Sequence, residues 1–400
     1  MLSAITESGR RICISDIKND LILHKMKEGE KFYCPECKEK LILKIGRQKI
    51  PHFAHYRVTN CSRYENESSY HLAGKEKLYL WLKDQGFQPQ LEPYDQTIAQ
   101  RPDICFTYQG IKIAIEFQCS IISEPLMKKR TNAYTSNNYY PIWILGGNQF
   151  KRKKAEIVSI SSFQYSFLSI KDEKSCLLFY CPNSNQLIFV RQIIPTTLRN
   201  AVATISIVPL QQVSINDLLT PPKYTPFSVI SWQKEMNHFK TNYALSPKAF
   251  KDPFLRYLYE NHHHITQLPP EIGLPVPSSP FIKTPPIIWQ SYIYFDVIQK
   301  LNIGDQFSIH DVIIAIAQRI RKKQIIIRDF SLGKGDVLLP VNEYLNLLVQ
   351  CQYLIKVETI SFQIARKLEQ TSNASDQKII ENAFYQKYQK VINLSYRNNE

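Results

Sequence analysis

The chain has 400 residues, 44% of them hydrophobic, and its 50 Lys and Arg against 35 Asp and Glu give a net charge of +15 at pH 7. This length predicts several domains with cores of their own, and the charge predicts an anionic partner, for which the phosphate backbone of nucleic acid is the first candidate. The sequence has no segment apolar enough to cross a membrane, no basic amphipathic helix of the membrane-binding kind and no continuous apolar export signal, so we expect a cytoplasmic protein without a membrane partner.

The first part of the chain carries a pattern of zinc ligands. Cys34 and Cys37 form a Cys-x-x-Cys pair, and His52 and His55 follow after a segment that reads as a hairpin. Two thiolates from one tight turn and two imidazoles from a returning strand would supply the four ligands of a tetrahedral zinc ion. Cys61 lies close enough to replace one histidine. With no open coordination position, such a site is expected to be structural or to contact DNA.

A helix is predicted next, with Ser69 as its N-cap and an end near residue 83. His71, Lys75, Leu78 and Leu82 fall on one stripe of this helix, which should lie against a sheet near its polar edge. The alternative is that the polar members of the stripe are ordinary helix-surface residues.

The string RPDICFTYQGIKIAIEFQ, residues 101–118, reads as two strands joined by a tight turn at residues 109–110. Counting outward from that turn brings Asp103 opposite Glu116. One face of the second strand is apolar and the other carries the glutamate. Two carboxylates so close destabilise a sheet unless a cation neutralises them, and oxygen ligands favour Mg²⁺ or Mn²⁺ over zinc. A surface hairpin with two solvated acids is the alternative.

RPDI followed by IAIEFQ resembles the core of the PD-(D/E)xK nucleases, with Asp103 and Glu116 at the two metal-binding positions. The resemblance implies a restriction-endonuclease-like α/β fold and catalytic roles for residues of the preceding helix, here His71 and Lys75. Where those nucleases usually have lysine, this chain has Gln118, which can orient water but supplies no charge. Arg101, which pairs with Gln118 in the predicted register, or Lys75 is expected to restore that charge.

A further helix is predicted to begin after Ser123, followed by a buried strand at residues 141–145. Arg130 and Tyr134 lie one turn apart on this helix. They resemble the QxxxY element of exonuclease-like PD-(D/E)xK members, with arginine in place of glutamine, and this resemblance implies that they hold a DNA phosphate.

Four motifs in order, namely CPEC with PHFAH, SYHLAGKEKLYLWL, RPDI and IEFQCS, resemble the CoiA competence proteins of Gram-positive bacteria. All four lie within residues 1–170. The resemblance implies a cytosolic protein made during competence that promotes the processing or recombination of internalised transforming DNA. The expected partners are single-stranded DNA and recombination proteins.

The rest of the chain is divided by its prolines, which cluster at residues 268–286 and suggest a linker. Beyond it, three helices and a strand pair follow in the order of a winged helix, a module that docks DNA or protein. The expected parts are a zinc-finger-like module at residues 1–65, a nuclease-like domain at 66–215, a proline-containing bridge and linker at 216–286, and a mostly helical C-terminal domain at 287–400.

The sequence therefore predicts a multidomain α+β protein that acts as a metal-dependent nuclease. Asp103 and Glu116 would hold Mg²⁺ or Mn²⁺, Gln118 would orient the attacking water, and Lys75, Arg101 or Arg130 would bear phosphate charge. Two alternatives remain. One is a catalytically weak or inactive DNA-binding or recombination accessory factor that retains the fold, which the missing lysine favours, and the other is an adaptor that recruits recombination proteins through the C-terminal domain.

Overall fold

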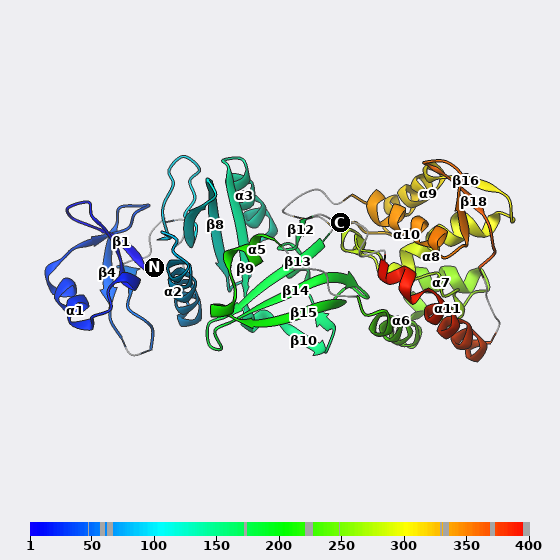
Figure 1. Ribbon diagram of the computed structural model, residues 1–400, viewed down its shortest axis with the longest axis horizontal. Coiled ribbons are helices and arrows are strands. Elements are labelled where there is room, and N and C mark those ends of the chain that lie inside the picture. The colour runs from blue at the N-terminus through cyan, green and yellow to red at the C-terminus, as the bar shows by residue number, and fades with distance from the viewer. Residues whose placement is uncertain are drawn as a thin grey trace. The chain divides into compact units, whose positions relative to one another are not determined.

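The computed structural model (Figure 1) describes residues 1–46, 48–56, 61, 67–171, 174–220, 227–247, 249–328, 330, 336–368 and 373–394. The chain forms two compact units, of which the first comprises Met1–Phe150, Leu177–Phe189 and Ser206–Pro222, and the second the remaining residues. Both units contain helices and strands, which confirms the predicted α+β class. In the described part of the chain, no helix has both the length and the apolar character that a membrane span requires.

The N-terminal part of the first unit is a five-stranded antiparallel sheet in the order β2-β1-β3-β4-β5. Its elements are β1 (Ser3–Thr6), β2 (Arg11–Cys13), α1 (Asp20–Gly29), β3 (Phe32–Tyr33), β4 (Lys40–Lys44) and β5 (His52–His55). Strands β4 and β5 are the two arms of the predicted hairpin, and their connection includes residue 47, which lies outside the described residues. This small core is formed mainly by Leu23, Phe32, Leu41, Leu43 and Phe53.

The central sheet of the first unit has the strand order β6-β7-β8-β9-β13-β14-β15. Its strands are β6 (Gln90–Leu91), β7 (Ile104–Tyr108), β8 (Ile111–Gln118), β9 (Tyr139–Gly146), β13 (Lys174–Cys181), β14 (Gln186–Pro195) and β15 (Asn200–Pro209), the last three shared with the second unit. Strand β8 pairs antiparallel with β7 and parallel with β9, and β9 pairs parallel with β13. A short helix, α5 (Ile215–Leu219), follows the sheet.

The β7–β8 hairpin has the register predicted from the sequence. Ile104 pairs with Ile115, and the strands turn at Gln109 and Gly110, whose φ angles of 48° and 79° are both positive. Such values at both central residues are those of a type I′ turn, which matches the twist of the flanking strands. Asp103, one residue before β7, therefore lies at the end of the ladder beside Glu116.

Two helices cover opposite faces of β8, as Figure 1 shows. Helix α2 (Ser69–Asp84) packs its buried Leu78 and Leu82 on the face that carries Ile113, Ile115 and Phe117. Helix α3 (Glu124–Thr135) covers the other face, where its Tyr134 meets Ala114. The cap of α2 is Ser68 rather than the predicted Ser69, whereas Ser123 caps α3 as predicted.

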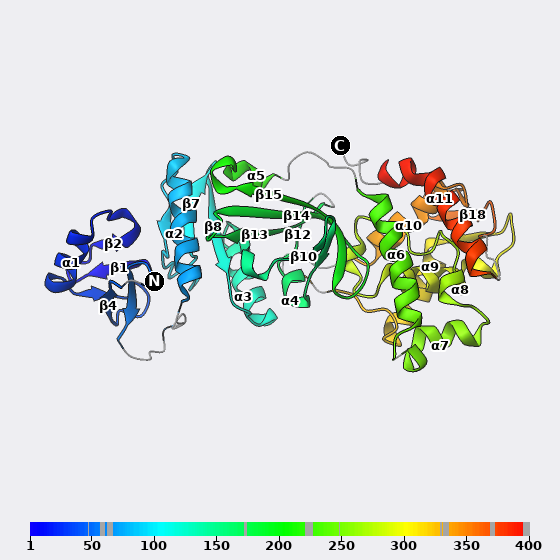
Figure 2. The same ribbon diagram turned by 90° about the horizontal axis from the view of Figure 1, so that it is seen from below.

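The second unit contains the C-terminal helices. Its elements are β10 (Lys151–Lys154), β11 (Ile157–Ser159), α4 (Ser162–Tyr165), β12 (Ser169–Lys171), α6 (Val229–Ala244), α7 (Pro253–Glu260), α8 (Pro286–Asp296), β16 (Gln306–Ser308), α9 (Ile309–Arg321), α10 (Leu338–Gln350), β17 (Leu354–Lys356), β18 (Ser361–Ile364) and α11 (Ala374–Leu394). Strands β16, β18 and β17 form a small antiparallel sheet in that order. Figure 2 shows α6 beside α11, where Lys240 forms a buried ion pair with Glu381.

The proline-rich stretch expected as a linker is instead part of the core of the second unit. Residues 268–276 are all buried. The indole Nε1 of Trp232 donates to the carbonyl of Gly273 at 2.9 Å, and the amide of Gln290 bonds both the N–H and the carbonyl of Leu274. Side chains of buried helices thus satisfy this backbone, as a buried segment without regular structure requires. Proline and apolar side chains here fill a core rather than extend a connector.

Gly74 of α2 lies where the helix meets β8, and a Cβ built on it would come within 2.0 Å of Cε1 of Phe117. We predict that Gly74→Ala lowers the stability of the first unit by about 1–3 kcal/mol, because the aromatic ring has to move within a packed core. The measurement is the midpoint of urea unfolding. Gly29→Ala, at the end of α1 with no atom within 4 Å of the new Cβ, is the control and should leave the midpoint unchanged or raise it.

Candidate active site and metal centre

Cys34, Cys37, His55 and Cys61 converge in the N-terminal part of the first unit, where one ligand atom from each lies within 4.8 Å of the others. The Sγ atoms of Cys34 and Cys61 are 3.9 Å apart, and Sγ of Cys37 is 3.3 Å from Nε2 of His55. Zinc–sulfur bonds of about 2.3 Å in a tetrahedron separate two sulfurs by roughly 3.8 Å. Burial lowers the pKa of His55, which favours the neutral, metal-binding imidazole. Three thiols and one imidazole therefore fit a zinc ion.

The fourth member of this group is Cys61 and not the predicted His52. The side chains of successive strand residues alternate between the two faces of a sheet, and two residues, Phe53 and Ala54, separate His52 from His55 along β5, so the two histidines point to opposite faces. The Nδ1 atom of His52 bonds the carbonyl of Ile50 at 2.9 Å instead. A histidine pair on one strand therefore cannot serve one ion here.

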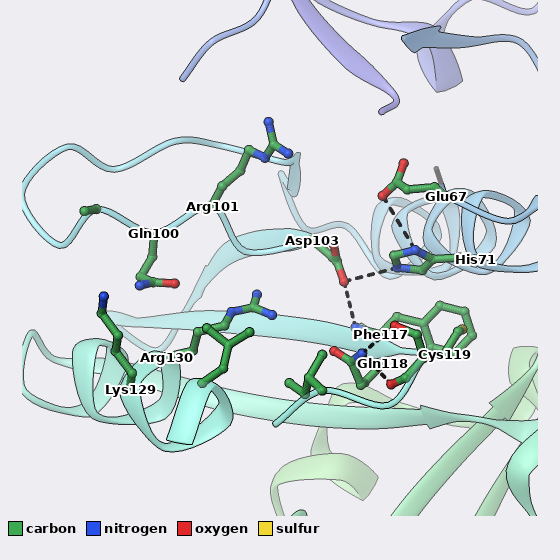
Figure 3. A pocket seen from close by; sticks show the side chains of 14 residues that line it. Glu67, His71, Gln100, Arg101, Asp103, Phe117, Gln118, Cys119, Lys129 and Arg130 are labelled. Atoms are coloured by element: carbon green, nitrogen blue, oxygen red, sulfur yellow. Dashed lines mark hydrogen bonds and ion pairs between the residues drawn. The ribbon is translucent and has the colours of Figure 1, made fainter. Parts of the chain in front are cut away.

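A pocket of about 210 Å³ opens at the end of β8, with α2, α3 and the loop before β7 around it. Figure 3 shows Glu67 and His71 on one side of the pocket and Lys129 on the other, with Asp103 between them. The lining residues with acidic, basic or imidazole side chains are Glu67, His71, Arg101, Asp103, Lys129 and Arg130. The pocket thus combines an acidic wall with a basic one.

Glu67, His71 and Asp103 form the acidic wall and could hold a metal ion, since one ligand atom from each lies within 4.8 Å of the others. Nε2 of His71 is 3.5 Å from Oδ2 of Asp103, and its Nδ1 is 3.6 Å from Oε1 of Glu67. That Nε2 is buried and has no hydrogen-bond partner among the described residues. An imidazole whose two nitrogens each lie near a carboxylate, one of them buried, fits a divalent cation.

Asp103 and Glu116 are neighbours in register, as predicted, but their carboxylates have different partners. Oδ2 of Asp103 accepts the backbone N–H of Phe117 at 2.9 Å, so this side chain extends the ladder towards α2. Glu116 points to the α3 face, where its Oε1 accepts from Arg130 and Tyr134. Among the described residues, the metal-capable group contains Asp103 without Glu116. Sequence alternation fixed the faces but did not reveal this capping hydrogen bond.

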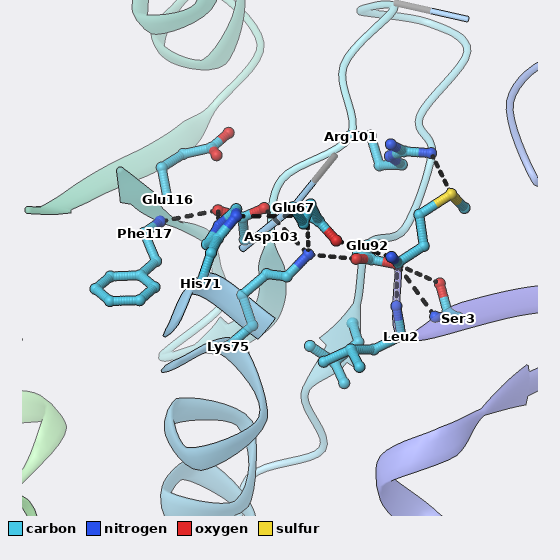
Figure 4. A network of polar contacts seen from close by, with 12 residues as sticks. Leu2, Ser3, Glu67, His71, Lys75, Glu92, Arg101, Asp103, Glu116 and Phe117 are labelled. Carbon is cyan, nitrogen blue, oxygen red and sulfur yellow. Dashed lines mark hydrogen bonds and ion pairs between the residues drawn. The ribbon is translucent and has the colours of Figure 1, made fainter. Parts of the chain in front are cut away.

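Lys75 lies beneath the acidic wall and is only 1% exposed. Its Nζ is 2.5 Å from Oε1 of Glu67, 2.5 Å from Oε1 of Glu92 and 3.9 Å from Oδ1 of Asp103 (Figure 4). Burial alone would lower the pKa of Lys75, but the carboxylates of Glu67 and Glu92 more than offset it and raise that pKa. Burial likewise opposes ionisation of Glu92, yet Lys75 brings the pKa of this carboxyl down to about 2. One ammonium thus faces three carboxylates.

The other predicted site residues differ in how they meet the pocket. Gln118 lines it, but its Nε2 donates to the carbonyl of Ser120 at 2.7 Å. Arg101 also borders the pocket, yet Figure 3 shows its guanidinium directed away from Gln118, and its Nη1 lies 3.8 Å from Sγ of Cys34 and 3.6 Å from Oε2 of Glu36. Lys75 is buried among carboxylates. The charged groups of Arg101 and Lys75 therefore do not point into the pocket, where the prediction had them bind phosphate.

Three residues in or near the pocket were missed by the sequence analysis. Glu67 stands directly before the Ser68 cap and four residues before His71, a spacing that brings two side chains together on one side of a helix start. Lys129, adjacent to Arg130, is exposed and lines the pocket. No motif in the sequence pointed to Glu92. Its role follows from contacts that only the folded chain makes, with Lys75 and with the backbone of Leu2 and Ser3.

Comparisons with known proteins divide the chain into three matched regions. The model for the N-terminal domain of competence protein CoiA matches residues 15–64, that for its nuclease-like domain residues 67–223, and that for its C-terminal domain residues 227–378. The competence protein CoiA of Bacillus subtilis (strain 168) is 31% identical over 266 residues, which cover 66% of this chain and 71% of that protein.

Cys61 and His52 give a direct test of the metal centre, because only the first belongs to the metal-capable group. We predict that Cys61→Ser lowers bound zinc, measured by a colorimetric chelator on unfolded protein, from about one equivalent to well below it, because a thiolate ligand is lost. His52→Ala should retain zinc at the wild-type level. Loss of zinc in His52→Ala with full retention in Cys61→Ser would contradict the ligand set assigned by the geometry.

Proposed function

This chain belongs to the competence protein CoiA family, as its ordered motifs predicted, and on that premise we propose that its nuclease-like domain is a metal-dependent deoxyribonuclease that processes internalised DNA during natural transformation. The observation that carries the proposal is the pocket in which Glu67, His71 and Asp103 converge opposite Lys129 and Arg130. The acidic wall could bind a metal cation, and the basic wall could bind the phosphate of a phosphodiester next to it.

The fold around the pocket supports assignment to the PD-(D/E)xK class. Helix α2, strands β7 and β8, helix α3 and strand β9 follow one another as that core requires, and the pocket opens where β8 ends. Asp103 and Glu116 keep the two acidic positions, and His71 and Glu67 add ligands from the start of α2. The α8-β16-α9-α10-β17-β18 order of the C-terminal part favours a winged-helix-like docking module.

The metal that this donor set favours is Mg²⁺ or Mn²⁺, because carboxylate oxygens suit hard ions and one imidazole suits Mn²⁺. When bound, it would polarise the scissile phosphate and lower the pKa of an attacking water. Glu67, His71 and Asp103 would hold it. The cysteine-rich group would hold zinc in a structural role.

The remaining side chains of the pocket act on the substrate. Lys129 is exposed on the basic wall and would bind a backbone phosphate. Arg130 neutralises Glu116 through a direct ion pair, and its guanidinium stacks 5.2 Å from the ring of Trp143. A phosphate that enters the pocket would compete with Glu116 for Arg130 and release that carboxylate towards the metal. Gln118 would orient water through its amide.

A DNA-binding accessory factor without cleavage is the second candidate. The amide of Gln118 is already bonded to the carbonyl and hydroxyl of Ser120, and no lysine stands at its position. This residue supplies no charge to a phosphorane-like transition state, which favours weak catalysis.

We predict that Asp103→Asn decreases the rate of Mn²⁺-dependent DNA cleavage by roughly a hundredfold or more, since even the partners behind metal ligands are worth 10- to 100-fold. DNA binding should persist, because the change removes a negative charge from the pocket. Cleavage of labelled single and double strands and binding by anisotropy are the measurements. Asp84→Asn, at the exposed end of α2, is the control. Wild-type protein that binds DNA but cuts neither form would favour the accessory factor.

Lys129→Gln tests the basic wall by itself. We predict weaker DNA binding and a slope of log affinity against log salt that falls by about 1, as expected for the loss of one phosphate contact. Affinity for Mn²⁺ should stay at the wild-type value, because this ammonium is not part of the metal-capable group. An unchanged salt slope would remove Lys129 from the DNA path.

A further inference from the structure

Two buried side chains of the nuclease-like domain reach the N-terminal sheet within the first unit. Oε2 of Glu92 accepts the backbone N–H groups of Leu2 and Ser3 at 2.9 and 3.1 Å. Arg101 is 4% exposed, and its Nη1 lies 3.8 Å from Sγ of Cys34 and 3.8 Å from Sδ of Met1, the second of which is the contact drawn in Figure 4. The metal-capable cysteine cluster therefore touches the segment that leads to Asp103.

The cysteine cluster can supply the counter-charge that the buried guanidinium of Arg101 needs. A buried cation is costly unless it is paired. The acid recorded beside it is Glu36, at 3.6 Å, while Nε of Arg101 is buried without a hydrogen-bond partner among the described residues. Metal-bound thiols are deprotonated, so three thiolates and one divalent ion carry a net charge of about −1. A loaded cluster thus places a negative centre against Arg101 at Cys34.

The position of Arg101 fixes the position of Asp103. Only Pro102 separates them, and its ring restricts the backbone between them. The backbone N–H of Glu92 donates to the carbonyl of Asp103 at 2.9 Å, so both ends of the loop are held at the N-terminal sheet. Glu92 and Ala99 adopt positive φ angles of 52° and 49°, a conformation that non-glycine residues keep only when surrounding contacts impose it.

We propose that the thiolate cluster formed when Cys34, Cys37, Cys61 and His55 hold a metal ion is the counter-charge of Arg101, and that through this arginine the loaded cluster sets the affinity of the pocket for its own divalent ion. The second half rests on the proposed function, because it takes Asp103 as a metal ligand. Arg101 is then a positioning residue that joins two metal sites. It is not a phosphate ligand.

The first half is tested on the full chain by chelator competition for zinc. Arg101→Gln should weaken zinc binding about 10- to 100-fold, the usual effect of removing a partner behind a metal ligand. Arg101→Lys, which keeps the charge, should recover most of that loss. Arg11→Gln is the matched control, because Arg11 donates to the carbonyl of Leu91 and so joins the same parts of the unit, while its cysteine neighbours among the described residues are Cys13 and Cys105, which lie outside the cluster. Zinc affinity equal to wild type in Arg101→Gln would overturn the proposal.

The second half is tested by Mn²⁺ binding, followed by electron paramagnetic resonance of the free ion, without DNA or turnover. Zinc-loaded Arg101→Gln should bind Mn²⁺ at least about fivefold more weakly than zinc-loaded wild type, within the usual range of coupling between sites. Circular dichroism verifies folding, and Arg101→Lys provides rescue if Gln destabilises the loop. Equal Mn²⁺ affinities would overturn the coupling. Wild-type protein that binds no Mn²⁺ contradicts the proposed function and this half together, while the zinc measurement still decides the first half.

Discussion

The ammonium of Lys75 is the contact on which the pocket depends. It joins three separate segments, because Glu67 precedes α2, Glu92 follows β6 and Asp103 precedes β7. Removing an ammonium from water is expensive, and the two carboxylates at 2.5 Å offset that cost. Without this charge, three carboxylates would repel one another in a region of low dielectric constant. The stripe position of Lys75 on α2 therefore serves assembly of the acidic wall rather than contact with phosphate.

The charges around Lys75 do not balance on their own, and this imbalance favours an additional cation. Glu67, Glu92 and Asp103 present three negative charges to two ammonium groups, those of Lys75 and of the Met1 N-terminus, which is 2.7 Å from Oε2 of Glu67. Glu92 also accepts the backbone N–H groups of Leu2 and Ser3, and each oxygen of Glu67 meets an ammonium, so the excess negative charge lies on the side of Asp103, beside His71. A divalent ion there would compensate the excess and give the buried Nε2 of His71 a partner. The same argument explains why Lys75 and a metal need not compete, since they lie on different sides of the carboxylates.

Local rules predicted the parts of this site that depend on neighbours in sequence. The Gln-Gly turn sets the β7–β8 register, and strand alternation separates Ile115 from Glu116. What those rules could not supply is the direction of a side chain at the end of a ladder. Asp103 lies one residue before β7, where strand pairing no longer sets the partner of a side chain, and its carboxylate accepts the N–H of Phe117. For the same reason Arg101, which strand pairing would aim at Gln118, turns to Cys34 through contacts between distant segments.

The N-terminal ligand set and the proline-rich stretch are instances of the same limit. Spacing suggested His52, yet β5 places its two histidines on opposite faces, and Cys61 enters from beyond the strand. Proline composition suggested a linker, yet Trp232 and Gln290 bond its backbone in a core. In each case the local sequence is compatible with two structures, and a contact between distant segments determines which of them forms.

The carboxylate of Glu116 is neutralised by the guanidinium of Arg130, so it does not need a second metal ion. Arg130 and Tyr134 both donate to one oxygen of this carboxylate, and the ring of Trp143 lies against the arginine. Replacing the glutamine of a QxxxY element by arginine thus gives the pocket a cation of its own at the Glu116 position. The metal at Glu67, His71 and Asp103 and the guanidinium at Glu116 would then divide the work of neutralising a phosphate. An ammonium at the position of Gln118 would add a further positive charge to a pocket of about 210 Å³ that Lys129 and Arg130 already line, and like charges at such range repel. Under the proposed assignment to the PD-(D/E)xK class, Arg130 and Gln118 would be substitutions that fit each other, and a phosphate in the pocket would meet positive charge although residue 118 is not a lysine.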